Sequence, residues 1–144
     1  MKAFLSIILL LTFGTGAWGV TPEELEVEKK YAEEGIVAAQ YNLGTIYANG
    51  KGVPQDYEEA AKWYRKAAEQ GEASAQWRLG LSYILEEGVI EDKVQAYAWF
   101  NIAAANGDED GKEWKATVAE EMTKEQIAKA LSREMIEAHP KLIN

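Results

Sequence analysis

The sequence predicts an all-α fold made of repeated helix pairs. The chain of 144 residues matches itself at an offset of 36 residues, and apolar side chains within each unit are spaced as helical faces. No stretch shows the strict alternation of apolar and polar residues that is typical of a half-buried strand. The length suffices for one packed domain.

Residues 1–19 are interpreted as an export signal rather than as part of the fold. Lys2 supplies a positive charge, residues 3–13 are apolar, and Ala17 and Gly19 occupy the −3 and −1 positions of a signal peptidase site. The apolar stretch is shorter than the roughly 20 residues that span a bilayer. We therefore expect cleavage near Gly19, no membrane insertion afterwards, and a periplasmic or secreted protein. The alternative is an uncleaved N-terminal anchor.

Residues 20–35 are expected to form a single cap helix, which corresponds to the second helix of a repeat unit. Thr21, the proline after it and Glu24 provide an N-cap, a favourable first helical residue and a capping-box acid. Glu24 and Glu28 stand where a full unit has apolar side chains. A more polar helix is suited to the outward-facing end of a repeat array.

Residues 36–71 and 72–107 are predicted to be two full units of two helices each. Their alignment contains no gap. The residues that recur include Ala39 and Ala75, Gln40 and Gln76, Leu43 and Leu79, Gly44 and Gly80, Tyr47 and Tyr83, Gly52 and Gly88, Asp56 and Asp92, Trp63 and Trp99, and Gly71 and Gly107.

The second helix of each unit has clear end signals. Asp56 and Asp92 are expected N-caps, with Glu59 and Gln95 three residues later to complete capping boxes. A glycine follows each helix in the position that a left-handed C-cap requires. The turn before the second unit carries Glu86, which costs about 1 kcal/mol if the position needs a positive φ. Alternatively, the preceding helix continues for one more residue.

Aromatic residues and mid-helix glycines predict how the helices pack. Gly44 and Gly80 lie inside helices, where glycine costs roughly 1 kcal/mol, so we expect close approach of a partner helix at both positions. Trp63 and Trp99 share their helical face with alanines, and we expect both in the core. Replacing Trp63 by alanine should then cost roughly 3–5 kcal/mol. The neighbouring aromatics with the same expectation are Tyr64 and Phe100.

Residues 108–144 are expected to form a degenerate repeat followed by a C-terminal cap helix. The apolar spacing shifts here to Trp114, Val118 and Met122. Thr123 and Gln126 then signal the start of a last helix. Its apolar stripe consists of Ile127, Leu131, Met135 and Ala138, and Pro140 ends it.

Composition excludes several classes of function. A net charge of −9 disfavours binding to nucleic acid and to anionic membranes. The absence of cysteine excludes disulfides, thiolate chemistry and Cys-ligated zinc. His139 is the only histidine and has no second ligand beside it, and Asp108 with Glu109 and Asp110 is better explained as a helix start than as a calcium loop. We expect no metal, no cofactor, no catalytic residue and no enzymatic activity.

The repeat resembles the Sel-1-like repeat family, which is related to tetratricopeptide repeats. The resemblance is carried by residues 39–44 (AQYNLG), 50–56 (GKGVPQD) and 60–71 (AAKWYRKAAEQG). It implies an α-solenoid, a right-handed superhelix of antiparallel helix pairs that serves as a scaffold for protein partners. Exported bacterial members resemble regulators or assembly factors of the cell envelope. Cysteine-rich members that bind or hydrolyse β-lactams carry a disulfide in each repeat, and this chain has none.

In the related tetratricopeptide geometry, first helices line a concave groove with the positions that are not used for packing. We therefore predict a partner-binding surface for a peptide or an amphipathic helix. The competing interpretation is that Tyr41 and Trp77 only fill space between helices, or lie beneath the C-terminal helix. The predicted residues are Tyr41, Asn42, Thr45, Asn49, Trp77, Arg78, Leu81 and Leu85.

The function expected from the sequence is a non-catalytic adaptor in the bacterial cell envelope that binds an unknown protein. Because two units make a short solenoid, dimerisation through the degenerate end is a further expectation. One alternative is an envelope hydrolase directed at peptidoglycan or a β-lactam, which paired carboxylates in an acidic cleft would favour. Another is a self-assembling structural module.

Overall fold

The computed structural model describes residues 19–132, which contain seven helices and no strand. The all-α prediction is therefore confirmed. The helices are α2 (Pro22–Glu33), α3 (Val37–Asn49), α4 (Tyr57–Glu69), α5 (Ala73–Leu85), α6 (Lys93–Ala105), α7 (Glu109–Ala119) and α8 (Lys124–Ala130).

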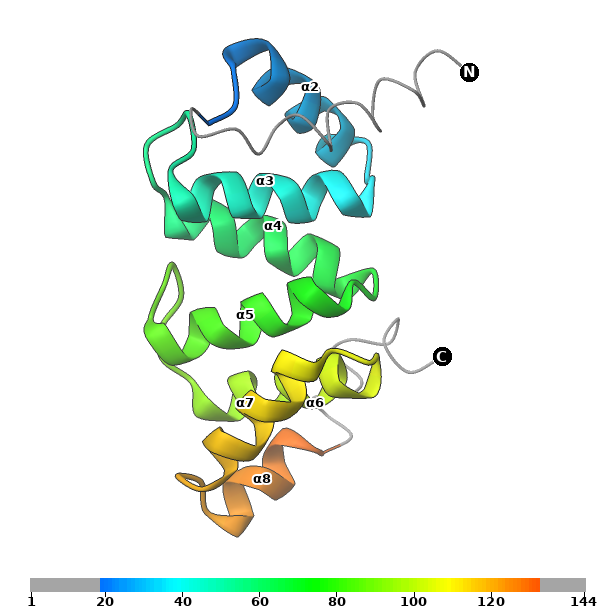
Figure 1. The fold of residues 1–144 in the computed structure, drawn as a ribbon. Helices are drawn as coiled ribbons and strands as arrows, with labels where there is room; N and C mark the ends of the chain where they lie inside the picture. The colour runs from blue at the N-terminus through cyan, green and yellow to red at the C-terminus, as the bar shows by residue number, and fades with distance from the viewer. Residues whose placement is uncertain (1–18, 133–144) are drawn as a thin grey trace.

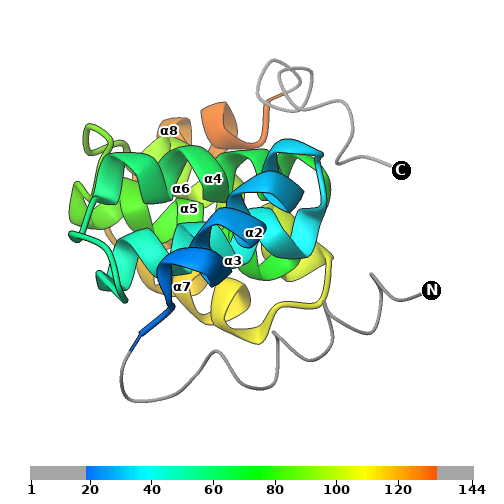
Figure 2. The ribbon, with the colours of Figure 1, turned by 90° about the horizontal axis from the view of Figure 1, so that it is seen from above.

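The helices are stacked in chain order from α2 at one end to α7 and α8 at the other (Figure 1). Each helix from α2 to α6 packs against the next, and α6 also packs against α7 and α8. Seen along the stack, α3 and α7 lie on one side and α4 and α8 on the other (Figure 2). We call α3, α5 and α7 the first helices and α2, α4, α6 and α8 the second helices. The predicted solenoid of helix pairs is confirmed.

Glycines within the first helices allow the helices of each pair to touch. A Cβ atom on Gly44 would lie 2.7 Å from ring atoms of Tyr64, and one on Gly80 would lie 2.6 Å from Phe100. Both rings are buried, so they could not move away without leaving a void. The predicted close approach is confirmed, and packing against the ring compensates for the low helix propensity of each glycine.

The two equivalent tryptophans are not equally buried, which corrects the expectation for Trp63. Trp99 is 1% exposed in a cluster with Ala60 and Tyr64, whereas Trp63 is only half-buried against α2 and α3. The positions of α2 that correspond to Ala60 and Tyr64 carry glutamates. Carboxylates do not seal an apolar interface as alanine and tyrosine do, so Trp63 keeps one side open.

Capping boxes are present at Thr21 and Thr123. The capping box predicted at Asp56 is wrong, because only one of its two hydrogen bonds forms. The Asp56 carboxylate accepts from the Glu59 backbone N–H at 3.0 Å, as expected for an N-cap. The Asp56 backbone N–H donates instead to the Tyr47 carbonyl oxygen at 2.9 Å. The Glu59 carboxylate is bound to Lys62 at 2.6 Å. The Asp56 backbone N–H, which would donate to the Glu59 carboxylate in a capping box, is therefore already bonded to a carbonyl group of α3.

Two buried glutamines join neighbouring units, a role that the sequence reasoning missed. Gln40 donates to the Ala32 carbonyl oxygen at 3.1 Å and accepts from the Gln70 side chain at 2.7 Å. Gln76 repeats both bonds with Ala68 and Asn106, at 3.1 and 3.0 Å. Recurrence of the glutamine at an offset of 36 was the only signal in the sequence. It shows that the position matters but does not show its partners.

The remaining predictions for the C-terminal part divide at residue 132. Val118 and Met122 are buried and Trp114 is half-buried, as predicted, and Asp108 caps α7 through the Gly111 N–H. In the predicted stripe of the last helix, Ile127 packs against the core, but Leu131 is exposed and caps the end of α8, so the described helix ends well before Pro140. Met135, Ala138, His139 and the export signal up to residue 18 lie outside the described residues. Between residues 19 and 132, no helix is both long enough and apolar enough to cross a bilayer.

Candidate partner-binding face

The eight predicted residues share one surface of α3 and α5, which we call the first-helix face. By helical spacing, they lie on the side of each helix opposite the buried leucines Leu43 and Leu79. Asn49 and Leu85 are exposed, and the other six residues are half-buried. The surface therefore offers side chains that a partner could cover.

In the first repeat this face is polar. Gly44 has no side chain, so the Tyr64 ring packs closely against α3 at this position. The Tyr64 hydroxyl therefore reaches Thr45, with 3.3 Å between the two oxygens. The Tyr41 ring packs beside it at a centroid distance of 5.9 Å. Burial raises the pKa of the Tyr64 hydroxyl, partly offset by the Thr45 hydrogen bond and the positive charge of Arg78, so the phenol is neutral at physiological pH.

In the second repeat the same positions are apolar. Phe100 takes the place of Tyr64 and stacks on Trp114 of α7 at 6.0 Å between ring centroids. Leu81 takes the place of Thr45. Trp77 and Leu81 both pack against the cluster formed by α6, α7 and α8. The face therefore changes from hydroxyl groups to hydrocarbon along the stack.

Arg78 packs beside Trp77 in the second repeat and interacts electrostatically with Tyr64 of the first repeat. The Arg78 Cζ atom is 4.4 Å from the centroid of the Trp77 ring, and its charge acts on Tyr64. The Arg78 Nε and the Trp77 Nε1 atoms are buried without a hydrogen-bond partner. No ion pair joins Arg78 to any acid within residues 19–132. One side-chain N–H group of Arg78 and one of Trp77 are therefore buried without a hydrogen-bond acceptor.

Asn42 is engaged within the protein. It occupies the position that Arg78 has in the second repeat, and its side chain bonds to Glu28 of α2. Burial raises the pKa of the Glu28 carboxyl group, an effect that the Asn42 bond partly offsets, and Glu28 Oε1 has no hydrogen-bond partner. Asn42 therefore contributes to the joint between α2 and α3 before it contributes to any binding surface.

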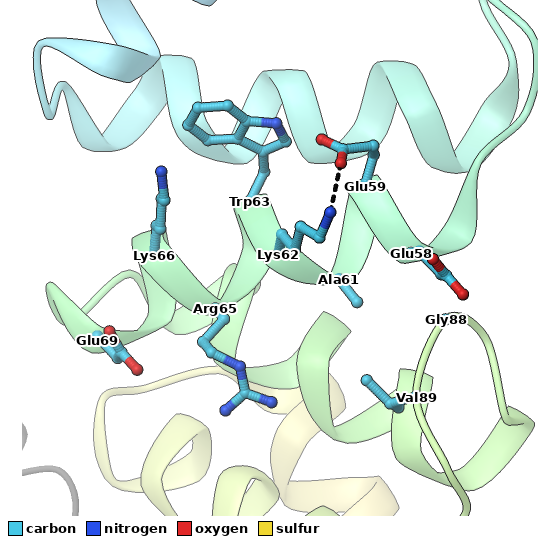
Figure 3. A pocket seen from close by; sticks show the side chains of 10 residues that line it. All are labelled: Glu58, Glu59, Ala61, Lys62, Trp63, Arg65, Lys66, Glu69, Gly88 and Val89. Atoms are coloured by element: carbon cyan, nitrogen blue, oxygen red, sulfur yellow. Dashed lines mark hydrogen bonds and ion pairs between the residues drawn. The ribbon is translucent and has the colours of Figure 1, made fainter.

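Two pockets lie away from the first-helix face, one on the outer side of α4 and one around the turn between α5 and α6. The first has a volume of about 410 Å³ and includes Trp63, Lys66 and Val89 (Figure 3). The Lys66 Nζ atom is 4.3 Å from the centroid of a Trp63 ring. The second, of about 470 Å³, includes Tyr57 and Ile90. None of the eight predicted residues lines either pocket, and the sequence reasoning did not anticipate them.

The described part of the chain offers no grouping of ligands suited to a metal. Within residues 19–132, no three histidine, cysteine, aspartate or glutamate side chains come close enough to hold an ion. Asp108, the first residue of the acidic run, accepts a 2.6 Å hydrogen bond from the Gly111 backbone N–H. Its carboxylate serves as a helix cap.

Comparison with known proteins identifies the class to which this architecture belongs. Residues 37–72 and 73–108 each match the Sel1 repeat, so half of the chain is covered and the protein belongs to the Sel1 repeat family. The fold of this family generally serves as a non-catalytic scaffold for protein–protein interaction. Among functionally curated proteins, none matches the chain.

Two solved structures are similar to this chain. One is a protective antigen present in uropathogenic Escherichia coli strains that displays an SLR fold, with 39% sequence identity and a TM-score of 0.81 over 92% of this chain. The other is a Sel1 repeat protein from Oxalobacter formigenes, with 41% identity and a TM-score of 0.65 over 66% of this chain. The chain spans only 29% and 28% of the length of these two relatives.

Proposed function

We propose that this protein is an adaptor that binds a segment of a partner protein on the first-helix face. The observation that carries the proposal is the pair of unsatisfied donors at Trp77 and Arg78. A buried polar group without a partner costs about 1–3 kcal/mol, and more when it is charged. Each such group in a native structure calls for an explanation, and an acceptor on a bound partner is the one that we propose here.

The chemistry of the face indicates what the partner segment brings. Arg78 has no counter-charge among the described residues, so a carboxylate or a polarised carbonyl group is the complementary acceptor. Tyr41 and Trp77 provide flat, half-buried aromatic surface on either side for apolar side chains. A short segment that combines an acidic residue with apolar neighbours fits this arrangement.

We also propose that the adaptor acts in the cell envelope. The support is the charged, apolar and small-residue pattern of residues 1–19. The proposal predicts that protein recovered from the periplasm begins at Val20, which mass spectrometry of the intact chain checks. A chain that retains Lys2 and stays in the cytoplasm would contradict export without affecting the binding face.

The binding proposal is tested by comparing two arginines. Arg78→Gln removes the unpaired guanidinium, and Arg65→Gln removes one that donates to the Tyr83 hydroxyl at 2.5 Å and also lies near an aromatic ring. We expect Arg78→Gln to weaken capture of partners from an envelope extract by at least about tenfold while leaving stability unchanged or slightly higher.

Arg65→Gln should have the opposite signature. It should cost roughly 1 kcal/mol of unfolding free energy, measured with urea, and leave capture unaffected. If both variants capture the same proteins at wild-type levels, the first-helix face is not the binding site. If Arg78→Gln unfolds the protein, the guanidinium is structural and the proposal is equally wrong.

A further inference from the structure

The turn between α5 and α6, residues 86–92, exposes large apolar side chains that its counterpart in the first repeat lacks. Ile90 is 90% exposed and Leu85, just before the turn, is 50% exposed. The equivalent residues of the first repeat are Pro54 and Asn49. Ile90 projects almost entirely into solvent from the turn, and with Leu85 at the end of α5 it adds two exposed aliphatic residues to this part of the chain, which favours a contact surface here.

The same turn holds a backbone conformation that its sequence disfavours. Glu86 is the only described non-glycine residue with positive φ, at 56°, where the first repeat has Gly50. Strain of this kind is found preferentially at functional sites. Glu86, Glu87 and Glu91 form no ion pair with another described residue, so the segment that carries the apolar knob of Leu85 and Ile90 also carries negative charge that no ion pair neutralises.

A pocket of complementary character lies directly beside this knob. Gly88 and Val89 of the turn form one wall of the 410 Å³ pocket on α4 (Figure 3). Trp63 and Ala61 supply apolar surface, and its cations are Lys62, Arg65 and Lys66.

The charges of this pocket are mixed, but they are separated in space. Glu59 is neutralised by Lys62 at 2.6 Å. Figure 3 shows Glu58 next to Gly88 and Glu69 toward the opposite end of the pocket, with Lys62 between them. Because Lys62 is already paired with Glu59, Arg65 and Lys66 are the cations of this pocket that have no ion pair with a described residue, and they offer opposite charge to an acidic loop.

We propose that two copies of this chain pair through a twofold axis, each inserting Ile90 and its acidic turn into the α4 pocket of the other. A twofold interface requires a self-complementary patch, in which a knob and its pocket lie side by side on one surface. The turn and the α4 pocket meet this requirement. The inference does not rest on the proposed function, because the pairing surface shares with the first-helix face only Leu85, at its edge.

The decisive experiment is a charge exchange followed by sedimentation equilibrium at concentrations from micromolar to several hundred micromolar. One variant carries Glu87→Lys and Glu91→Lys, and the other carries Lys62→Glu and Lys66→Glu. Each alone sets like charges against each other and should weaken self-association at least about tenfold. An equimolar mixture restores opposite charges at both contacts of the pair and should associate as the wild type does.

Two further variants separate the knob from general surface hydrophobicity. Leu85→Asn with Ile90→Pro installs the residues of the first repeat and should abolish association without unfolding, as circular dichroism checks. Leu131→Asp changes the exposed leucine that follows α8, 43% exposed, and should leave association unchanged. A wild type that stays monomeric throughout overturns the proposal. So does a dimer that survives either charge variant, or a mixture that fails to associate.

Discussion

The aromatic side chain that packs against the mid-helix glycine gives each repeat a different surface chemistry. Tyr64 passes over Gly44 and reaches Thr45, while Phe100 passes over Gly80 and has Leu81 in the matching place. A hydroxyl pair in one repeat and a hydrocarbon pair in the other keep the packing and change what a partner meets. At the residue scale, the family motif sets the scaffold, and these substitutions change the chemistry of the surface that the first helices present.

Glu28 gives a prediction about pH. Burial raises the pKa of its carboxyl group above the ordinary value of 4.5. The unfolded chain therefore loses this proton first as the pH rises, and the Glu28 contribution to the free energy of unfolding falls between pH 4.5 and the folded-state pKa. We expect Glu28→Gln to be more stable than the wild type at pH 7, and this advantage to shrink as the pH falls through the folded-state pKa of Glu28 toward 4.5.

Urea unfolding of both proteins between pH 4 and pH 8 measures this difference. The other carboxyl groups are common to the two proteins and cancel when the values are subtracted. A difference that is constant across the whole range would show that Glu28 titrates normally in the folded protein.

At the element scale, the position of a helix in the stack decides what its tryptophan contributes. Trp99 is enclosed between α4, α5 and α6, whereas Trp63 packs against the polar cap helix α2. We expect Trp99→Ala to cost about 3–5 kcal/mol. Trp63→Ala should cost clearly less, because part of its ring is already in contact with water. Equal losses in chemical denaturation would refute the unequal packing of the two helix pairs.

The turn between α5 and α6 provides a pair of opposite predictions. Glu86→Gly relieves the left-handed conformation and should stabilise the fold by about 0.5–1 kcal/mol. Gly88→Ala places a Cβ atom 2.1 Å from the Tyr57 carbonyl oxygen and should destabilise it by at least about 2 kcal/mol. Thermal unfolding checks both variants. A stabilising Gly88→Ala would mean that this turn is not packed against α4.

Most of the fold could be predicted from the sequence because the repeat constrains it locally. Helical spacing, N-caps and the glycine after each second helix are properties of neighbouring residues, and they predicted the elements from α2 to α8. Gly44 even predicted a tertiary contact, since a mid-helix glycine needs compensation. The capping box at Asp56 could not be judged in this way, because its N–H group was taken by a distant carbonyl group of Tyr47.

The candidate site was less accessible to sequence reasoning. The periodicity identified which positions face outward, but not which are already occupied, as Asn42 is by Glu28. The unsatisfied donors of Trp77 and Arg78 and the pocket beside Val89 arise from burial by other helices. Such features depend on contacts between units, which a single sequence does not specify.

At the scale of the whole molecule, a short stack leaves two separate surfaces available. The first helices present Tyr41, Trp77 and Arg78, whereas α4 presents the pocket that includes Trp63, and the turn before α6 presents Ile90. One surface can therefore hold a partner while the other joins two copies. Pairing would give two binding faces in one assembly and increase avidity for a partner that repeats or clusters.

The measurement that tests the central claim most directly is site-specific photo-crosslinking in the living cell. Benzoylphenylalanine at Thr45 or Leu81 probes the first-helix face, and the same residue at Glu69 probes the outer side of α4. We expect a crosslinked partner protein from Thr45 and Leu81 that disappears when Arg78→Gln is added. Adducts that come only from Glu69, or that persist with Arg78→Gln, would contradict partner binding on the first-helix face.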